Sequence, residues 1–351
     1  MRKISALTVA TVFTGSFLGA GFLSGQELLQ FFGVFGGYGL AGMVLSICAF
    51  CLFSALVLFV SRRTGQTEFD RIIVKADLPW LRGLVNAVFL FFLFDVLVTM
   101  VAGAGALLEQ VFGLPAAAGN ALMTALILLV ALSGTSGLLA SFNIVVPLLV
   151  AAAAVVSLLS PSVLSPGPIE ARPFSTGAPL LGNWLLSALS FVSYNMMAAV
   201  SILAPLSRDM EGPGTVRRGL AVGTGLLALI SVCILLPMVV YQGEIGGEAL
   251  PMLALADRVA APLGIVYALL LFAGMFTGGL SSLYGITARL QAAGRGGHRR
   301  TVVLLCVPAF FGSLFGFTDL VRFVYPICGY VGFFALLGIL HHAFLLWREG
   351  A

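Results

Sequence analysis

Charged residues are scarce in this chain. Asp, Glu, Lys and Arg make up 9% of the 351 residues, whereas hydrophobic residues make up 60%. A soluble domain carries roughly 25% charged residues, so the composition excludes a soluble globular protein. The mean hydropathy of +1.10 instead indicates a chain that is embedded in a lipid bilayer.

Residues that commonly carry catalysis are also few. The three histidines and five cysteines are scattered and form no zinc-hydrolase motif, and no glycine-rich phosphate loop ends in Lys-Ser or Lys-Thr. A buried free cysteine behaves as a small hydrophobe, so we expect no disulfide, metal cluster or organic cofactor. We therefore expect neither an enzyme nor, without a partner subunit, an ATP-driven pump.

Long apolar runs dominate the sequence. A transmembrane helix needs about 20 apolar residues, whereas a barrel strand needs only about ten with alternating polarity. The sequence therefore predicts an all-α membrane protein with about ten transmembrane helices. The predicted spans cover residues 5–32, 38–60, 83–112, 116–132, 141–159, 183–206, 219–241, 262–290, 301–317 and 323–347.

The basic residues predict the orientation. With the amino terminus inside, fifteen of the eighteen Lys and Arg residues face the cytoplasm, and Arg172, Arg258 and Arg322 face outward. This positive-inside bias predicts a multi-pass protein of the inner (cytoplasmic) membrane with both termini in the cytoplasm. The net charge of +4 then reflects topology, and we expect no nucleic-acid partner. The inward set is Arg2, Lys3, Arg62, Arg63, Arg71, Lys75, Arg82, Arg208, Arg217, Arg218, Arg289, Arg295, Arg299, Arg300 and Arg348.

The ten predicted spans divide into two sets of five. Residues 1–160 are expected to form the first five-helix repeat, residues 161–181 an extracellular crossover loop, and residues 182–351 the second five-helix repeat. Because each set crosses the membrane an odd number of times, a repeated unit would be inverted. We also expect a helical lid at residues 249–256, outside the membrane.

Glycines interrupt the first span. Residues 14–27 read TGSFLGAGFLSGQE, and each glycine costs a helix interior about 1 kcal/mol relative to alanine. Unwound backbone at membrane depth must be buried in protein or line a wet cavity. We therefore predict a discontinuous first helix whose freed backbone groups bind a ligand. Alternatively, Gly15 with Gly19, and Gly21 with Gly25, are helix-packing motifs.

A matching interruption is predicted in the second half. Ser193, Tyr194 and Asn195 are consecutive near the middle of the sixth span. Three consecutive side chains cannot all face one neighbour in a regular helix, because successive residues are about 100° apart. We therefore also predict a discontinuous sixth helix, although this segment lacks a glycine.

The first span resembles a known family. Residues 15–22, GSFLGAGF, are similar to the unwound first helix of the leucine-transporter-like fold in the amino acid–polyamine–organocation superfamily. Their continuation, GAGFLSGQE at 19–27 with FFG at 31–33, resembles the YkvI-like membrane proteins. The resemblance extends over nearly the whole chain through the helix count and residues 193–195. It implies a five-plus-five inverted repeat with discontinuous first and sixth helices.

The resemblance further implies one coupling-ion site between the first and eighth helices. Uncharged carbonyl and hydroxyl oxygens suit a hard cation that must be released again, so a sodium ion is the one possible bound ion. The alternative is that these small residues only allow close helix packing; Thr277 would replace a ligand if the register differs. The implied ion ligands are Gly15, Leu18, Gly278, Ser281 and Ser282.

The substrate is expected at the two helix breaks. Half-helix amino termini attract an anionic group and carboxyl termini attract a cation, so an amino acid or related zwitterion or amine would suit both. The candidate substrate-binding residues are Gly19, Ala20, Gly21, Ser193, Tyr194 and Asn195.

Two carboxylates lie inside predicted spans. An ionised carboxylate in the membrane is costly and should face a cavity, form a pair or carry a proton. Glu27, just after the first break, is a candidate gate, proton carrier or helix cap. Asp95, among phenylalanines, is a candidate proton carrier or a structural partner of another polar side chain.

These features predict a secondary active transporter that moves a small organic solute by alternating access, with symport of sodium or protons. In proton-coupled relatives a lysine on the fifth helix often replaces the sodium ion, and residues 141–159 contain Asn143 but no lysine. The alternative is a non-transporting membrane sensor or assembly component that keeps the transporter fold. In that case Phe17 and Phe22 would seal the cavity at the first helix.

Overall fold

Long apolar helices make up most of the protein. The computed structural model describes residues 5–75, 78–133, 142–174, 179–207, 213–292, 294 and 297–350, and in these ranges eight helices are long and apolar enough to cross a membrane. They coincide with eight predicted spans; the other two correspond to a broken first segment and a shorter helix, α14 (His298–Ser313). The all-α class is confirmed, and the number of crossings stays a prediction. Arg2, Lys3, Ser141, Arg208 and Arg295 lie outside the described residues.

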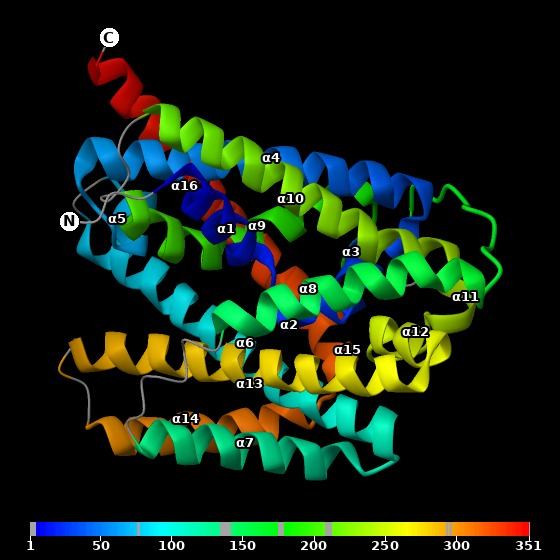
Figure 1. The fold of residues 1–351 in the computed structure, drawn as a ribbon. Helices are drawn as coiled ribbons and strands as arrows, with labels where there is room; N and C mark the ends of the chain where they lie inside the picture. Colours follow the sequence, from blue (N-terminus) through cyan, green and yellow to red (C-terminus); the bar gives the residue numbers. More distant parts are fainter. Residues whose placement is uncertain are drawn as a thin grey trace.

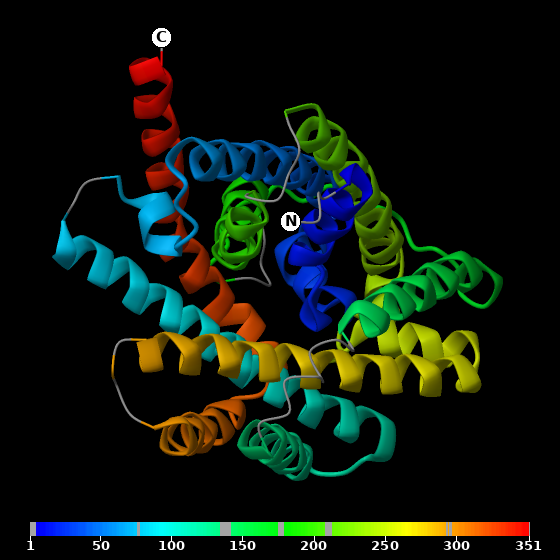
Figure 2. The ribbon, with the colours of Figure 1, turned by 60° about the vertical axis from the view of Figure 1, so that its left-hand side comes forward.

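The long helices form two groups that lie side by side (Figures 1 and 2). In the first group, α1 and α4 each pack against α9 and α10. In the second group, α7, α13 and α14 all pack against α6. The first group is α1 (Ala6–Phe17), α4 (Gly37–Thr64), α9 (Trp184–Leu206) and α10 (Pro213–Val240), and the second is α6 (Pro79–Phe112), α7 (Ala116–Ser133), α13 (Ala261–Ala292) and α14.

Two helices connect the groups. α8 (Phe142–Leu159) packs against α10 and α13, and α16 (Tyr325–Gly350) packs against α4 and α9 and also touches α6. α16 continues from α15 (Phe317–Asp319) and a π-helical turn, η5 (Leu320–Val324). A movement of one group against the other would therefore involve α8 and α16.

Short elements lie at the two ends of the long helices. α5 (Phe69–Ile73) lies toward the same end as the start of α1 and the end of α16, whereas α11 (Gln242–Ile245) and α12 (Pro251–Val259) lie at the other end (Figure 1). The crossover segment bonds to this second end, where the Gly37 amide donates to the Glu170 carbonyl at 2.9 Å. A helix is present where a helical lid was expected at residues 249–256, namely α12, and its role as a lid stays a prediction. Residues 175–178 of the crossover lie outside the described residues.

Local signals in the sequence define several helix ends. Gly65 after α4 and Gly113 after α6 have φ of 70° and 65°, the left-handed conformation in which glycine ends a helix without steric cost. The Asn183 side chain caps α9 by accepting the Leu186 amide at 2.9 Å. The two glycines therefore mark where α4 and α6 end, and Asn183 marks where α9 begins.

Aromatic packing holds the first segment against α9. Phe191 on α9 is fully buried, and its ring centroid lies 5.3 Å from Phe31, 4.8 Å from Phe32 and 5.8 Å from Phe50. Such pairs contribute about 0.5–1.5 kcal/mol each beyond their buried area. The cluster anchors the end of the first segment, and it also reaches the glycine-rich middle, where the ring centroid of Phe22 lies 6.3 Å from that of Phe191.

Candidate functional site

The first segment is interrupted twice. α1 ends at Phe17, α2 spans Ala20–Leu23, α3 spans Gln26–Phe31, and a short 3-10 turn, η1 (Gly33–Phe35), follows. At the first break, Leu18 and Gly19 are non-helical and the Gly19 amide bonds to the Phe17 carbonyl at 3.2 Å. The predicted discontinuous first helix is confirmed, and the second break, at Ser24 and Gly25, was not separately predicted.

Hydrogen bonds from α12 and α13 hold the second break. Ser24 Oγ donates to the Gly21 carbonyl at 2.6 Å, the Met252 amide of α12 donates to the Ser24 carbonyl at 3.0 Å, and the Tyr267 hydroxyl of α13 donates to the Leu23 carbonyl at 2.6 Å. A freed backbone carbonyl that is buried must find such partners. Helices α12 and α13 therefore close this side of the segment.

The first break is open in comparison. Gly15 and Gly19 are exposed, and a Cβ added to either would meet no other atom within 4 Å. Gly21 differs, because a Cβ there would overlap Glu27 Oε1. No helix therefore packs against the side of Gly15 or Gly19 where a Cβ would lie, which argues against the helix-packing interpretation of this pair. The first break is exposed, whereas the second is closed.

Glu27 connects the broken segment to α9. Its side chain is 6% exposed; Oε1 lies against Gly21, and Oε2 accepts a hydrogen bond from the Tyr194 hydroxyl. Glu27 also lies in the first turn of α3, where a carboxylate is favourable. The structure therefore brings Glu27 together with Gly21 and Tyr194, two of the candidate substrate-binding residues.

Asp95 lies on the opposite group of helices. It is buried on α6, its Oδ2 atom is 3.9 Å from Cys328 Sγ of α16, and it is close enough to Glu27 for an electrostatic interaction. Tyr194, which bonds to Glu27, also packs on Tyr325 of α16, with ring centroids 5.0 Å apart. In the described part of the chain, neither carboxylate forms an ion pair with a basic side chain.

The predicted discontinuity of the sixth helix is wrong for the described structure. α9 is continuous from Trp184 to Leu206. Ser193 Oγ donates to the Gly329 carbonyl of α16 at 2.6 Å, Tyr194 reaches Glu27 of α3, and Asn195 Nδ2 donates to the Phe191 carbonyl of its own helix at 3.0 Å. Each polar side chain finds a different partner, so the helix need not unwind to satisfy them.

The candidate ion ligands lie on the first segment and on α13, and the described contacts do not bring the two sets together. α13 approaches the first segment at α2, where a Cβ on Gly274 would be 3.5 Å from Ala20 Cβ. Gly278 instead faces Met100 of α6. The side of Gly15 that a Cβ would occupy is open, as described above, so the structure does not pack it against α13. The described contacts leave the Ser281 and Ser282 hydroxyls without a hydrogen-bond partner, whereas Thr277 bonds to its own helix.

Sequence reasoning missed several polar residues at this site. Tyr267, Tyr325 and Cys328 are buried beside the broken segment or Asp95. A tyrosine within an apolar run is a usable signal, because its hydroxyl requires a partner once it is buried. The partners themselves come from distant helices, so their identity was not readable from spacing.

Comparison with known proteins places this geometry in a known fold. No family model matches the chain. It is 28% identical over 339 residues to the uncharacterized membrane protein YkvI of Bacillus subtilis (strain 168), which covers 96% of each chain. It is also 28% identical over 332 residues to the uncharacterized protein YyaD of the same organism, which covers 94% of this chain and 95% of that one.

Two solved structures share the arrangement of helices. The inward-facing conformation of Mhp1 superposes with a TM-score of 0.63 at 12% identity and covers 96% of this chain and 76% of that chain. A variant of the manganese transporter of Eremococcus coleocola gives a TM-score of 0.63 at 12% identity, with 95% and 78% coverage. At such identities the likeness shows the fold alone. The chain is therefore a multi-pass, all-α membrane protein with the fold of Mhp1, similar in sequence to YkvI and YyaD.

Proposed function

We propose that this protein is a secondary active transporter that moves a small organic solute by alternating access. The observation that carries the proposal is the doubly broken first segment, which belongs to the first group at α1 and contacts α13 and α6 of the second group at α2. It is closed by α12 and α13 at one break and exposed at Gly15 and Gly19 at the other. Broken helices at membrane depth provide unpaired backbone groups for a ligand. Access from one side only is the condition that alternating access requires.

An amino acid or a related zwitterion or amine fits the chemistry of this site. Backbone groups of Gly19, Ala20 and Gly21 would bind the substrate, with Tyr194 facing them from α9. A substrate ammonium group would be attracted by Glu27, which has no basic partner among the described residues. Those residues also include no cluster of three or more His, Cys, Asp or Glu side chains that could hold a metal ion. The proposal therefore favours an organic solute over manganese.

Cation coupling is the second part of the proposal. A sodium ion would bind Gly15, Leu18, Gly278, Ser281 and Ser282 once α1 and α13 approach each other, and the uncommitted hydroxyls of Ser281 and Ser282 support this. Protons would instead use Glu27 and Asp95, which lie on opposite groups of helices. Two ionised carboxylates would repel each other across that boundary, so binding a proton would favour closure.

The charge distribution supports an orientation as well. The end of the molecule that carries α5 and the end of α16 would face the cytoplasm of a cell with an inner membrane, because most basic residues lie in the segments assigned to that side. The open break at Gly15 and Gly19 would then face inward.

A ligand screen on the purified protein tests the proposal. A ligand that binds only the folded state raises the unfolding temperature by mass action. We would measure thermal shifts with amino acids and small amines, each in sodium or potassium, for the wild type and for Ser282→Ala and Asp95→Asn. Sodium-dependent stabilisation that Ser282→Ala weakens would support the ion site, whereas pH-dependent stabilisation that Asp95→Asn flattens would support proton coupling.

The same screen can contradict the proposal. Absence of a shift with every solute, followed by absence of uptake in proteoliposomes, would favour the non-transporting sensor or assembly component. Phe17 and Phe22 are both buried, and Phe17 stacks on Phe50 with centroids 4.1 Å apart, so a sealed first segment is the structural form that this alternative would take.

A further inference from the structure

A large groove lies outside the candidate transport site. It has a volume of about 1030 Å³ and lies between α6 and α16, with α5 along one side and Met197 of α9 at its base. Several of its side chains are apolar and face outward: Trp80 is 68%, Leu337 61% and Phe334 77% exposed. Because α6 and α16 are long and apolar enough to cross a membrane, we expect the groove to open toward lipid.

Close packing of α16 against α9 and α5 creates the groove. Gly332 and Gly338 both line it, and a Cβ on Gly332 would overlap Ser193 Oγ while one on Gly338 would lie 2.5 Å from Ile73 Cγ2. The His342 ring nitrogen Nδ1 bonds to the Ile72 carbonyl at 2.8 Å. These contacts fix α9 and α5 close to α16, and the groove is the space that remains between α5, α6 and α16.

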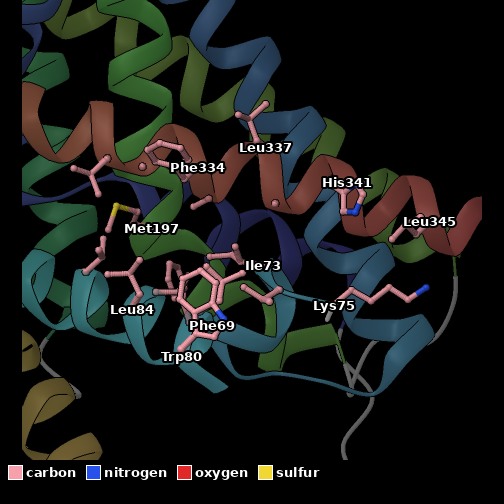
Figure 3. A pocket seen from close by; sticks show the side chains of 18 residues that line it. Phe69, Ile73, Lys75, Trp80, Leu84, Met197, Phe334, Leu337, His341 and Leu345 are labelled. Carbon is pink, nitrogen blue, oxygen red and sulfur yellow. The ribbon is translucent and has the colours of Figure 1, made fainter. Parts of the chain in front are cut away.

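The two ends of the groove differ in polarity. Lys75 and His341 both lie toward one end, on different elements, whereas Met197, Phe334 and Leu84 lie toward the other (Figure 3). The charged end is the end of α16 that the positive-inside bias assigns to the cytoplasm. From Val331 to Leu345 a helix rises about 21 Å, which exceeds half of a hydrocarbon core that is about 30 Å thick. The groove therefore has the length of one leaflet and a basic group where that leaflet meets water.

We propose that this groove binds an anionic phospholipid of the inner leaflet, with its phosphate at Lys75 and His341 and an acyl chain extending toward Met197. Charge complementarity supports this occupant, since basic side chains near the membrane surface attract acidic lipids. Lys75 pairs with Glu349 at the rim, and the lipid phosphate competes with that carboxylate. The inference does not depend on the transported solute.

Native mass spectrometry of the purified full-length protein tests the proposal. The protein in detergent would be titrated with phosphatidylglycerol or with phosphatidylcholine of the same acyl chains. One basic residue near the surface is worth about five-fold in affinity, so we expect phosphatidylglycerol to bind several-fold more tightly. Lys75→Gln should remove about five-fold of that preference, and Glu349→Gln, which breaks the same ion pair but keeps the cation, should maintain or increase it.

A second pair of variants separates the groove from the rest of the lipid-facing surface. Ala335→Trp places a large side chain in the groove and should abolish the tightest binding of both lipids, whereas Ala151→Trp, on the exposed face of α8, should not. Arg258→Gln breaks a comparable exposed ion pair at the opposite end and controls for net charge. Equal binding of the two lipids, or equal effects of the two tryptophan variants, would overturn the proposal.

Discussion

The first segment and α9 received the same prediction from the sequence, and only one of them is broken. The first segment changes direction at Leu18–Gly19 and again at Ser24–Gly25, whereas α9 continues without interruption from Trp184 to Leu206. Both segments have polar residues at membrane depth. The difference is that the first segment has glycine at each break and α9 has hydroxyl and amide side chains.

This difference has a physical cause. Glycine removes the side chain that would stabilise a helix and permits conformations such as the φ of 84° at Gly25. Ser193, Tyr194 and Asn195 instead keep the helix and direct their polar atoms outward to α16, α3 and the helix's own backbone. A polar cluster in a membrane helix therefore indicates partners on neighbouring helices, and glycine is needed before it indicates a break.

The largest expected effect is that of removing the glycine at the second break. In Gly25→Ala the left-handed backbone is strained, and the new Cβ lies 2.9 Å from Met238 Sδ and 2.9 Å from Met252 Cγ. Strain and overlap together should destabilise the protein by about 2–5 kcal/mol. Thermal unfolding in detergent measures this. Gly19→Ala is the matched control, because its backbone φ of −90° suits alanine and the added Cβ meets open space. Equal loss of stability in both variants would show that the two breaks do not differ as described.

The fold was largely predictable because membrane insertion imposes simple constraints. Eight spans and the first break follow from apolar length and from glycine content, which are local properties. The double break was harder to predict, because its carbonyls are bonded by groups more than 200 residues away in the sequence. The Met252 amide of α12 donates to the Ser24 carbonyl, and the Tyr267 hydroxyl of α13 donates to the Leu23 carbonyl. Tertiary partners of this kind have no signature in a single sequence.

An intermediate loss of stability is expected when the hydrogen bond between the first segment and α9 is removed. Tyr194→Phe removes the hydroxyl that donates to the buried Glu27 carboxylate and should cost about 1–3 kcal/mol. Glu27→Gln keeps an acceptor for that hydroxyl and should change stability less, while it removes the charge that the proposed substrate or proton requires. Unfolding curves and uptake in proteoliposomes would be compared for both variants.

Two further variants make this comparison quantitative. The double variant Tyr194→Phe, Glu27→Gln should be more stable than the sum of the two single losses predicts, because the residues are in contact. Tyr330→Phe removes a hydroxyl that bonds to the Leu180 carbonyl away from the site and should leave uptake intact. Additive losses in the double variant would contradict a direct link between Glu27 and Tyr194.

The sequence predicted which residues belong to the candidate site better than it predicted which of them are in contact. Gly21, Glu27 and Tyr194 do meet, although the sequence indicated Glu27 as a candidate gate, proton carrier or helix cap and the other two as substrate-binding residues. Asp95 was noticed because a carboxylate among phenylalanines is costly, but its neighbours Cys328 and Tyr325 come from α16. Helix spacing indicates which residues share a face, and it does not indicate which distant helix that face meets.

The smallest loss of stability is expected on substitution of Ser193. The sequence predicted that this residue binds the substrate, whereas in the structure it bonds to α16. Ser193 Oγ donates to the Gly329 carbonyl at 2.6 Å and points to α16 rather than to the break. Ser193→Ala should therefore cost about 0.5–1.5 kcal/mol of stability and leave the affinity for the transported solute unchanged. Ser187→Ala, which removes a comparable bond to the Phe31 carbonyl, is the matched control for stability. If Ser193→Ala changes the solute affinity and Ser187→Ala does not, Ser193 contacts the substrate after all. In that case α9 must rotate or unwind during transport, which this conformation does not require.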